Sequence, residues 1–284
     1  MAWKSAAMMA TAAALAASGV ARGEFTRNIM ITGYWPPTNE MLRPFSQNSS
    51  QNPGGWQGLN WEGRGYNIYS YFPEFPGGVN QNPRGTGDFQ VDYQAASADF
   101  WRITGELKPC AIITFSRGDP GSNWELESRA RKLPLNQWSP DYLAPTQPTP
   151  DLPIASEPDG MIRYSSLPMS DIRTAVQAAI PGFNAFIDTS NNFGGTFVSE
   201  FTSYHGAWYQ NLHSSPNDPA QCFAGGHIHV GINTPLATAQ IATFATLRTL
   251  EGYLDSVIPV PSPSVGAVLA AGAMLAGRGR RARG

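Results

Sequence analysis

Three segments of this 284-residue chain carry side chains that could act together on a carbonyl group. Segment 116–127 ends in glutamates, the glycine-rich segment 190–199 ends in the hydroxyl of Ser199, and segment 225–231 contains His227 and His229. A hydroxyl nucleophile, an imidazole base and a carboxylate are the set that nucleophilic acyl transfer requires. Residue types alone are unspecific, so the elements that would bring these segments together matter.

Strands and helices alternate along the predicted chain. Short apolar runs predict strands at 28–33, 65–72, 110–115, 183–188 and 226–231. Apolar residues at helical spacing predict helices at 92–107, 171–180, 196–212 and 238–254, and the Pro-rich stretches 34–65 and 133–160 predict loops. This order predicts a single α/β domain with a mainly parallel, twisted sheet and helices on both faces. Ligands bind such sheets at the carboxyl ends of the strands, where the three polar segments should gather.

Several motifs occur in the order found in pyroglutamyl peptidase I, the cysteine peptidase that removes N-terminal pyroglutamate. The matching positions are Thr32-Gly33-Tyr34-Trp35-Pro36, Asn52-Pro53, Lys108-Pro109, Arg117, Glu127 with Ala130, Pro140-Asp141 and Leu167-Pro168. The family's nucleophile segment resembles Thr196-Phe197-Val198-Ser199, and its histidine motif resembles His229-Val230. The chain therefore resembles this family over residues 28–254, which implies a phosphorylase/hydrolase-like sheet.

The departures from the family pattern fall at its chemically important positions. Ser199 stands where the family has its nucleophilic cysteine, and Glu200 stands where an asparagine follows it. Pro37 replaces an aromatic residue that packs on the pyroglutamyl ring. A thiol can pair with imidazole as a thiolate, whereas a serine hydroxyl must lose its proton during attack. Retained activity and lost activity are both compatible with these changes.

The resemblance implies the following roles. Ser199 would be the nucleophile, His229 the general base, and Glu127 the orienting or substrate-binding acid. Tyr34, Trp35, Arg117 and His227 would contact a peptide or small-molecule substrate. No cofactor is expected, and a metal held by His227 and His229 would need a third ligand that the spacing does not supply. The alternatives are an inactive relative that binds peptides or small ligands, and an extracellular structural component.

The composition favours a globular domain without a nucleic-acid footprint. Apolar residues make up 42% of the chain and charged residues 14%, which allows a substantial core. The formal net charge is −2, so the chain lacks the basic excess that binds a phosphate backbone.

The two ends predict export. Residues 1–22 resemble a cleavable signal peptide, with Lys4 before an apolar stretch and small residues after it. Residues 258–284 combine a Pro-rich spacer, an apolar segment and terminal arginines, which resembles a bacterial PEP-CTERM sorting tail. The predicted domain therefore spans 23–257 in a protein of the cell envelope or exterior, with membrane contact through the tail before sorting. The exterior permits a disulfide between Cys110 and Cys222, but the apolar run around Cys110 favours a buried free thiol.

Overall fold

The central sheet is built from six short strands. The structure is a computed structural model that describes residues 25–191 and 193–258. Within these residues, six strands form one sheet in the order β2-β1-β3-β8-β4-β7. They are β1 (Asn28–Thr32), β2 (Asn67–Tyr71), β3 (Ala111–Gly118), β4 (Asn123–Glu127), β7 (Asn184–Asp188) and β8 (Ala224–Gly231). All neighbouring pairs are parallel except β4 and β8, which run antiparallel.

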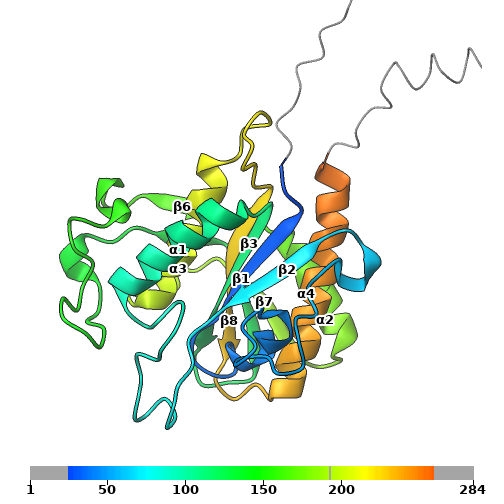
Figure 1. Cartoon of the computed structure of the whole chain (residues 1–284), viewed down its shortest axis with the longest axis horizontal. Coiled ribbons are helices and arrows are strands. Elements are labelled where there is room, and N and C mark those ends of the chain that lie inside the picture. Colours follow the sequence, from blue (N-terminus) through cyan, green and yellow to red (C-terminus); the bar gives the residue numbers. More distant parts are fainter. Residues whose placement is uncertain (1–24, 192, 259–284) are drawn as a thin grey trace, which may run out of the picture.

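Helices cover both faces of this sheet (Figure 1). On one face lie α1 (Tyr93–Leu107) and α3 (Val198–Leu212), and on the other lie α2 (Met169–Ala179) and α4 (Leu236–Val257). The strands β1, β2 and β3 divide their side chains between two apolar clusters, because successive side chains point to opposite faces, whereas β4, β7 and β8 contribute to the cluster on the α2 and α4 side. Ile29 and Ile31 of β1 pack with α2 and α4, whereas Met30 packs with α1 and α3. The predicted single α/β domain with a mainly parallel sheet is thus confirmed.

Short elements decorate the predicted loops. A two-stranded antiparallel ribbon joins β5 (Arg129–Arg131) to β6 (Ile162–Tyr164). Short 3₁₀ helices occur at η1 (Glu40–Phe45), η2 (Trp61–Gly63), η3 (Leu135–Gln137) and η4 (Pro153–Ser156). The excursion between β5 and β6 places Trp138 and Ile154, both buried, against the α1 and α3 cluster.

One strand departs from the sequence prediction. The sequence pattern ends a strand at residue 115 and predicts none in 116–127, but the second half of that segment is β4, which reverses direction and pairs with β8. Trp124 and Leu126 of β4 are fully buried, so burial of these two side chains stabilises the strand despite the two glutamates that alternate with them. This strand carries two carboxylates, those of Glu125 and Glu127.

The ends of the described chain adjoin the regions predicted to be a signal and a tail. Phe25 packs edge-on against Phe223, and Ile258 is 5% exposed and joins the core. The predicted signal peptide, and the predicted tail beyond Ile258, lie outside the described residues. Among the residues described, no helix is both long and apolar enough to span a membrane. Cys110 and Cys222 are buried free thiols.

Candidate active site

Strand register places the chemically active residues on one face of the sheet. Glu125 lies opposite His229, and Glu127 lies opposite His227, in the antiparallel pair of β4 and β8. Asp188, the last residue of β7, is the register partner of Glu127. The intervening residues of β4 and β8 pack into the cluster on the α2 and α4 side. Carboxylates and imidazoles therefore face the α1 and α3 side, since strand side chains alternate between faces.

The start of α3 faces these side chains. Ser199 is the second residue of that helix, and its Oγ donates a hydrogen bond to the carbonyl oxygen of Gly194 at 3.1 Å. The turn before the helix needs residues that accept left-handed backbone, with φ of 54° at Phe193 and 93° at Gly195. First-turn N–H groups of a helix have no intrahelical acceptor and carry the positive end of its dipole. A negative charge that develops beside Ser199 would meet those donors.

Glu200 fixes the turn that carries Gly194. One oxygen of this fully buried carboxylate accepts the backbone N–H of Gly194 at 2.8 Å, and the other accepts the backbone N–H of Arg131. Burial raises the pKa of Glu200 to about 8, although both N–H bonds oppose the shift. Gly194 passes so close that a Cβ there would lie 2.7 Å from Glu200 Oε2 and 3.2 Å from His229 Cε1. Residue 194 must therefore be glycine, because its backbone passes too close to Glu200 and His229 to leave room for a side chain.

A buried hydrogen bond joins the predicted base to the predicted acid. Nδ1 of His229 lies 2.8 Å from Oε1 of Glu127, and the two side chains are 9% and 4% exposed. A carboxylate can only accept, so His229 donates from Nδ1 and carries its lone pair on Nε2. This is the tautomer that a general base facing a hydroxyl requires.

His227 lies behind this pair. Its Nε2 is 3.4 Å from Nε2 of His229, and its Nδ1 is 2.7 Å from Oγ1 of Thr114. The Thr114 hydroxyl donates to the carbonyl oxygen of Gly226 at 3.4 Å and accepts from Nδ1–H of His227, so no N–H of His227 occupies the Nε2 lone pair of His229. Burial and the neighbouring imidazole hold the pKa of His227 well below its usual value, so the ring is neutral.

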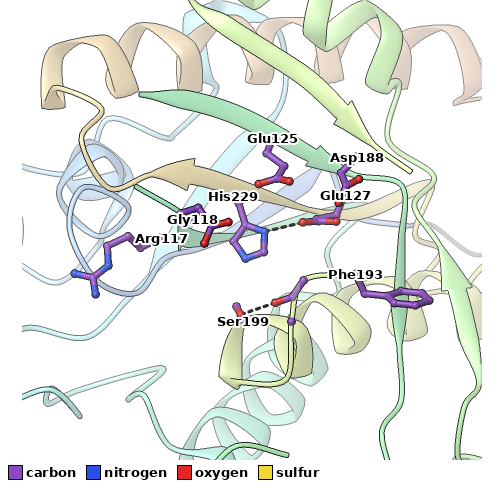
Figure 2. Close-up of a pocket in the computed structure, with 11 residues that line it drawn as sticks. Arg117, Gly118, Glu125, Glu127, Asp188, Phe193, Ser199 and His229 are labelled. Atoms are coloured by element: carbon purple, nitrogen blue, oxygen red, sulfur yellow. Dashed lines mark hydrogen bonds and ion pairs between the residues drawn. The ribbon is translucent and has the colours of Figure 1, made fainter. Parts of the chain in front are cut away.

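Two cavities meet at Ser199. The larger, of about 340 Å³, is called here the acidic pocket (Figure 2). Its lining residues are Arg117, Gly118, Asp119, Glu125, Glu127, Asp188, Phe193, Gly194, Gly195, Ser199 and His229. The smaller, of about 60 Å³, is called the aromatic pocket. It is lined by Tyr34, Trp35, Val91, Ser116, Arg117, Phe197, Val198 and Ser199.

Arg117 and Trp35 form part of the wall between the two pockets. The Arg117 guanidinium lies 4.4 Å from the centroid of the Trp35 ring, and that ring stacks on Phe197 at 6.0 Å. The indole N–H of Trp35 donates to the carbonyl of Pro83 at 2.8 Å, which fixes the ring. In Figure 2 the guanidinium points away from His229. Burial lowers the pKa of Arg117, for which no carboxylate partner exists in the described part of the chain.

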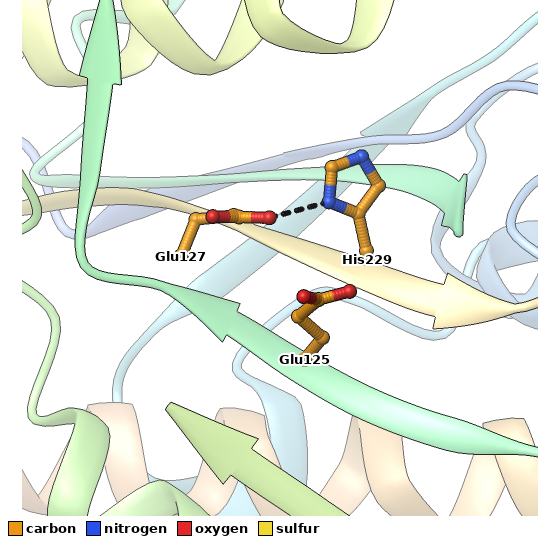
Figure 3. A group of neighbouring side chains, drawn as sticks. All are labelled: Glu125, Glu127 and His229. Atoms are coloured by element: carbon orange, nitrogen blue, oxygen red, sulfur yellow. Dashed lines mark hydrogen bonds and ion pairs between the residues drawn. The ribbon is translucent and has the colours of Figure 1, made fainter. Parts of the chain in front are cut away.

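Glu125 completes a group of potential metal ligands. One ligand atom each from Glu125, Glu127 and His229 lies within 4.8 Å of the other two (Figure 3). Two carboxylates and an imidazole are suitable ligands for a divalent cation such as Zn²⁺. Burial and the charge of Glu127 raise the pKa of Glu125 to about 7. No third ligand for His227 and His229 was predicted, because the spacing of residues did not indicate β4.

Most of the residues predicted from sequence converge, and one does not. Ser199, His229 and Glu127 line the acidic pocket, and Tyr34, Trp35 and Arg117 line the aromatic pocket. His227 lines neither cavity and is 1% exposed, so it contacts His229 rather than a cavity. Sequence reasoning missed Glu125, Asp188 and Glu200. The alternation of Trp124 and Leu126 with two glutamates was the available signal for Glu125.

Comparison with solved structures places the fold among pyrrolidone carboxyl peptidases. The enzyme from Thermococcus litoralis superposes with a TM-score of 0.55 at 18% identity, over 83% of this chain and 99% of that one. The enzyme from Pyrococcus furiosus gives 0.55 at 14% identity, over 80% and 99%. No family model and no curated protein sequence matches the chain. At these identities the likeness establishes a pyroglutamyl-peptidase-like fold.

Proposed function

We propose that this protein hydrolyses amides of pyroglutamyl or closely related acyl groups, with Ser199 as nucleophile. The observation that carries the proposal is the meeting of Ser199, His229 and Glu127 in one cavity, with a buried bond joining Glu127 to His229. The structural neighbours support it, because the pyrrolidone carboxyl group of their names is the pyroglutamyl group.

The proposed reaction follows from the positions of the three side chains. The Ser199 hydroxyl breaks its hydrogen bond to the carbonyl oxygen of Gly194 and turns toward His229. Its proton passes to Nε2 of His229 as its Oγ forms a bond to the substrate carbonyl carbon. The resulting oxyanion is stabilised by first-turn N–H groups of α3, and Glu127 stabilises the imidazolium. The C–N bond then breaks as His229 returns the proton to the leaving nitrogen. Water, deprotonated by His229, cleaves the acyl-serine ester and regenerates Ser199.

A coumarin amide tests the proposal directly. Pyroglutamyl-7-amino-4-methylcoumarin should release fluorescent amine with the natural protein, and a fluorophosphonate should label Ser199. Ser199→Ala should abolish both signals, whereas Ser170→Ala, a matched change at an exposed serine, should retain them. Absence of turnover and of labelling in the folded natural protein would refute the hydrolase.

A second candidate function is non-catalytic binding of the same acyl amides. The observation that favours it is that the Ser199 hydroxyl donates its hydrogen bond to the carbonyl oxygen of Gly194 and not to His229. Hydrogen bonds at catalytic sites often form only when substrate is bound, so this geometry does not decide against the enzyme. Binding of a pyroglutamyl amide without labelling by the fluorophosphonate would identify the binding protein.

The proposed site of action is outside the cytoplasm. The pattern of residues 1–22 supports export, and the pattern of 258–284 supports handling by a sorting enzyme at the membrane. Serine also suits an oxidising exterior, because a low-pKa thiol there would be oxidised. Fractionation of cells that produce the full chain, with mass spectrometry of both termini, tests export and cleavage together.

A further inference from the structure

The two pockets at Ser199 differ sharply in chemistry, and that difference bears on the substrate. The aromatic pocket is walled by Tyr34, Trp35 and Phe197, whereas the acidic pocket holds Asp119, Glu125 and other carboxylates. Ser199 lines both, so a bond cleaved at its Oγ would have one half of the substrate in each. The remaining question is which half lies where.

The position of His229 assigns the halves. In acyl transfer the base that takes the nucleophile's proton delivers it to the leaving nitrogen, so the leaving group must lie beside that base. His229 lines the acidic pocket and does not line the aromatic one. The leaving amine therefore occupies the acidic pocket, and the acyl group occupies the aromatic pocket.

The charge of the acidic pocket then constrains the leaving group. Four carboxylates line it, from Asp119, Glu125, Glu127 and Asp188. Glu127 is committed to His229, and Asp188 accepts hydrogen bonds from the backbone N–H and hydroxyl of Ser190 at 2.6 and 2.8 Å.

Glu125 and Asp119 are the carboxylates left over. Neither side chain makes a hydrogen bond or ion pair with another residue of the described chain. Of the cations nearby, Arg117 is stacked on Trp35, and Arg129 and Arg131 stack on Phe193 without lining the cavity. The pocket therefore has an excess of negative charge on the side where the leaving amine must lie.

We propose that the acidic pocket selects substrates whose leaving group carries a positive charge, such as a peptide with lysine or arginine after the acyl residue. This selectivity rests on the proposed hydrolase and names its substrate class. Glu125 is the principal contact, because it lies opposite His229 in the strand register and its carboxylate makes no hydrogen bond or ion pair with any residue that the structure describes. A carboxylate a few ångströms from an ammonium group in a partly buried site favours binding, and an anionic leaving group is repelled.

Three dipeptide amides that differ only in charge test the proposal. They are the C-terminal amides of pyroglutamyl-lysine, pyroglutamyl-glutamine and pyroglutamyl-glutamate. The lysine amide should exceed the glutamate amide in kcat/KM by about tenfold to a hundredfold. Glu125→Gln should lower that ratio about tenfold. Glu106→Gln, the same change at an exposed glutamate, should leave the ratio unaltered.

A binding measurement separates failure of this inference from failure of the hydrolase. Calorimetric titration of the three amides into Ser199→Ala reads the charge preference without turnover. Turnover of all three amides at equal rates would overturn the inference and leave the hydrolase standing. If no amide is cleaved, the hydrolase proposal fails and the titration alone tests the acidic pocket. Tighter binding of the lysine amide to Ser199→Ala, weakened when Glu125→Gln is added to that variant, would support the acidic pocket as a cation site. Equal binding of the three amides would overturn it. Repeating the titration with EDTA tests whether a metal ion occupies the carboxylates instead, and a preference that appears only with EDTA would show this.

Discussion

Glu127→Gln tests the central pair of the proposed site with a nearly isosteric change. The carboxylate accepts from Nδ1 of His229 at 2.8 Å, and both side chains are almost fully buried. A glutamine keeps the shape and an acceptor oxygen, but it removes the negative charge that would stabilise the imidazolium formed during attack. It can also present its amide N–H₂ to Nδ1, which favours the wrong tautomer of the base.

The expected loss is bounded from both sides. A hydrogen bond to a charged group contributes about 1.5–3 kcal/mol net, so removal of the charge should cost at least about tenfold to a hundredfold. Two unit charges 2.8 Å apart interact by about 6 kcal/mol at an effective dielectric constant of 20, which sets the upper end near 10⁴-fold. Because Glu127 acts on the charged imidazolium of the transition state, the loss should fall mainly on kcat.

The assay is steady-state hydrolysis of pyroglutamyl-7-amino-4-methylcoumarin by the natural protein, Glu127→Gln and the surface control Glu106→Gln. Circular dichroism and thermal unfolding establish that each variant is folded. If Glu127→Gln keeps kcat within about threefold of the natural protein while Ser199→Ala is inactive, the carboxylate does not assist the base and the triad argument is wrong.

Four further changes test other parts of the structure. Ser199→Cys should raise hydrolysis about tenfold or more by forming a thiolate-imidazolium pair, and an inert but folded cysteine variant would show that substrate positioning is lost. Gly194→Ala should lower activity about tenfold, because the added methyl group would press on His229. The control Gly105→Ala lies at an exposed helical position with open space around it, so it should leave activity unchanged and raise the free energy of unfolding in urea by about 0.5–1 kcal/mol. Burial lowers the pKa of His205 to about 4, whereas the same side chain in the unfolded chain has the ordinary pKa of 6.5. Below pH 6.5 the unfolded state therefore binds a proton that the native state does not, and the free energy of unfolding should fall by up to about 3 kcal/mol between pH 6.5 and 4. His205→Asn should remove that part of the pH dependence of unfolding. Added Zn²⁺ should inhibit and EDTA should restore activity, because the metal would occupy the imidazole needed as base; unchanged rates would argue against cation binding there.

The fold could be predicted where local pattern and burial agree. The runs that became β1, β3 and β8 are buried on both faces over most of their length, and apolar residues predominate in them although β8 also carries His227 and His229. The helices α1 and α4 were found within a few residues of their limits, since Asp92 caps α1 and Lys108 ends it in left-handed conformation. Ser199, His229 and Glu127 were expected to converge because the polar segments that carry them follow parallel strands at one edge of the sheet.

The missed features depend on contacts between distant parts of the chain. Glu200 was read only as a departure beside the nucleophile, because its partners, the N–H groups of Gly194 and Arg131, are brought together by the turn and by β5. His227 was expected to contact substrate because it shares a strand face with His229. The two rings are in contact, with centroids 4.5 Å apart, but His229 lines the cavity whereas His227 does not and is 1% exposed. One-dimensional alternation cannot tell which of two residues on a face is covered.

Burial of one face of β4 also accounts for the negative charge of the site. Trp124 and Leu126 are fully buried on the α2 and α4 side, so Glu125 and Glu127 must point to the opposite face, where His229 and Asp188 already lie. The strand cannot turn its carboxylates to solvent without exposing its two apolar anchors. A glutamate whose pKa is raised by folding, as at Glu125, weakens the native state once pH exceeds the value for the unfolded chain, so this carboxylate lowers stability at neutral pH. A cation bound beside Glu125 would remove that penalty, which gives the charged leaving group a thermodynamic reason to occupy the acidic pocket.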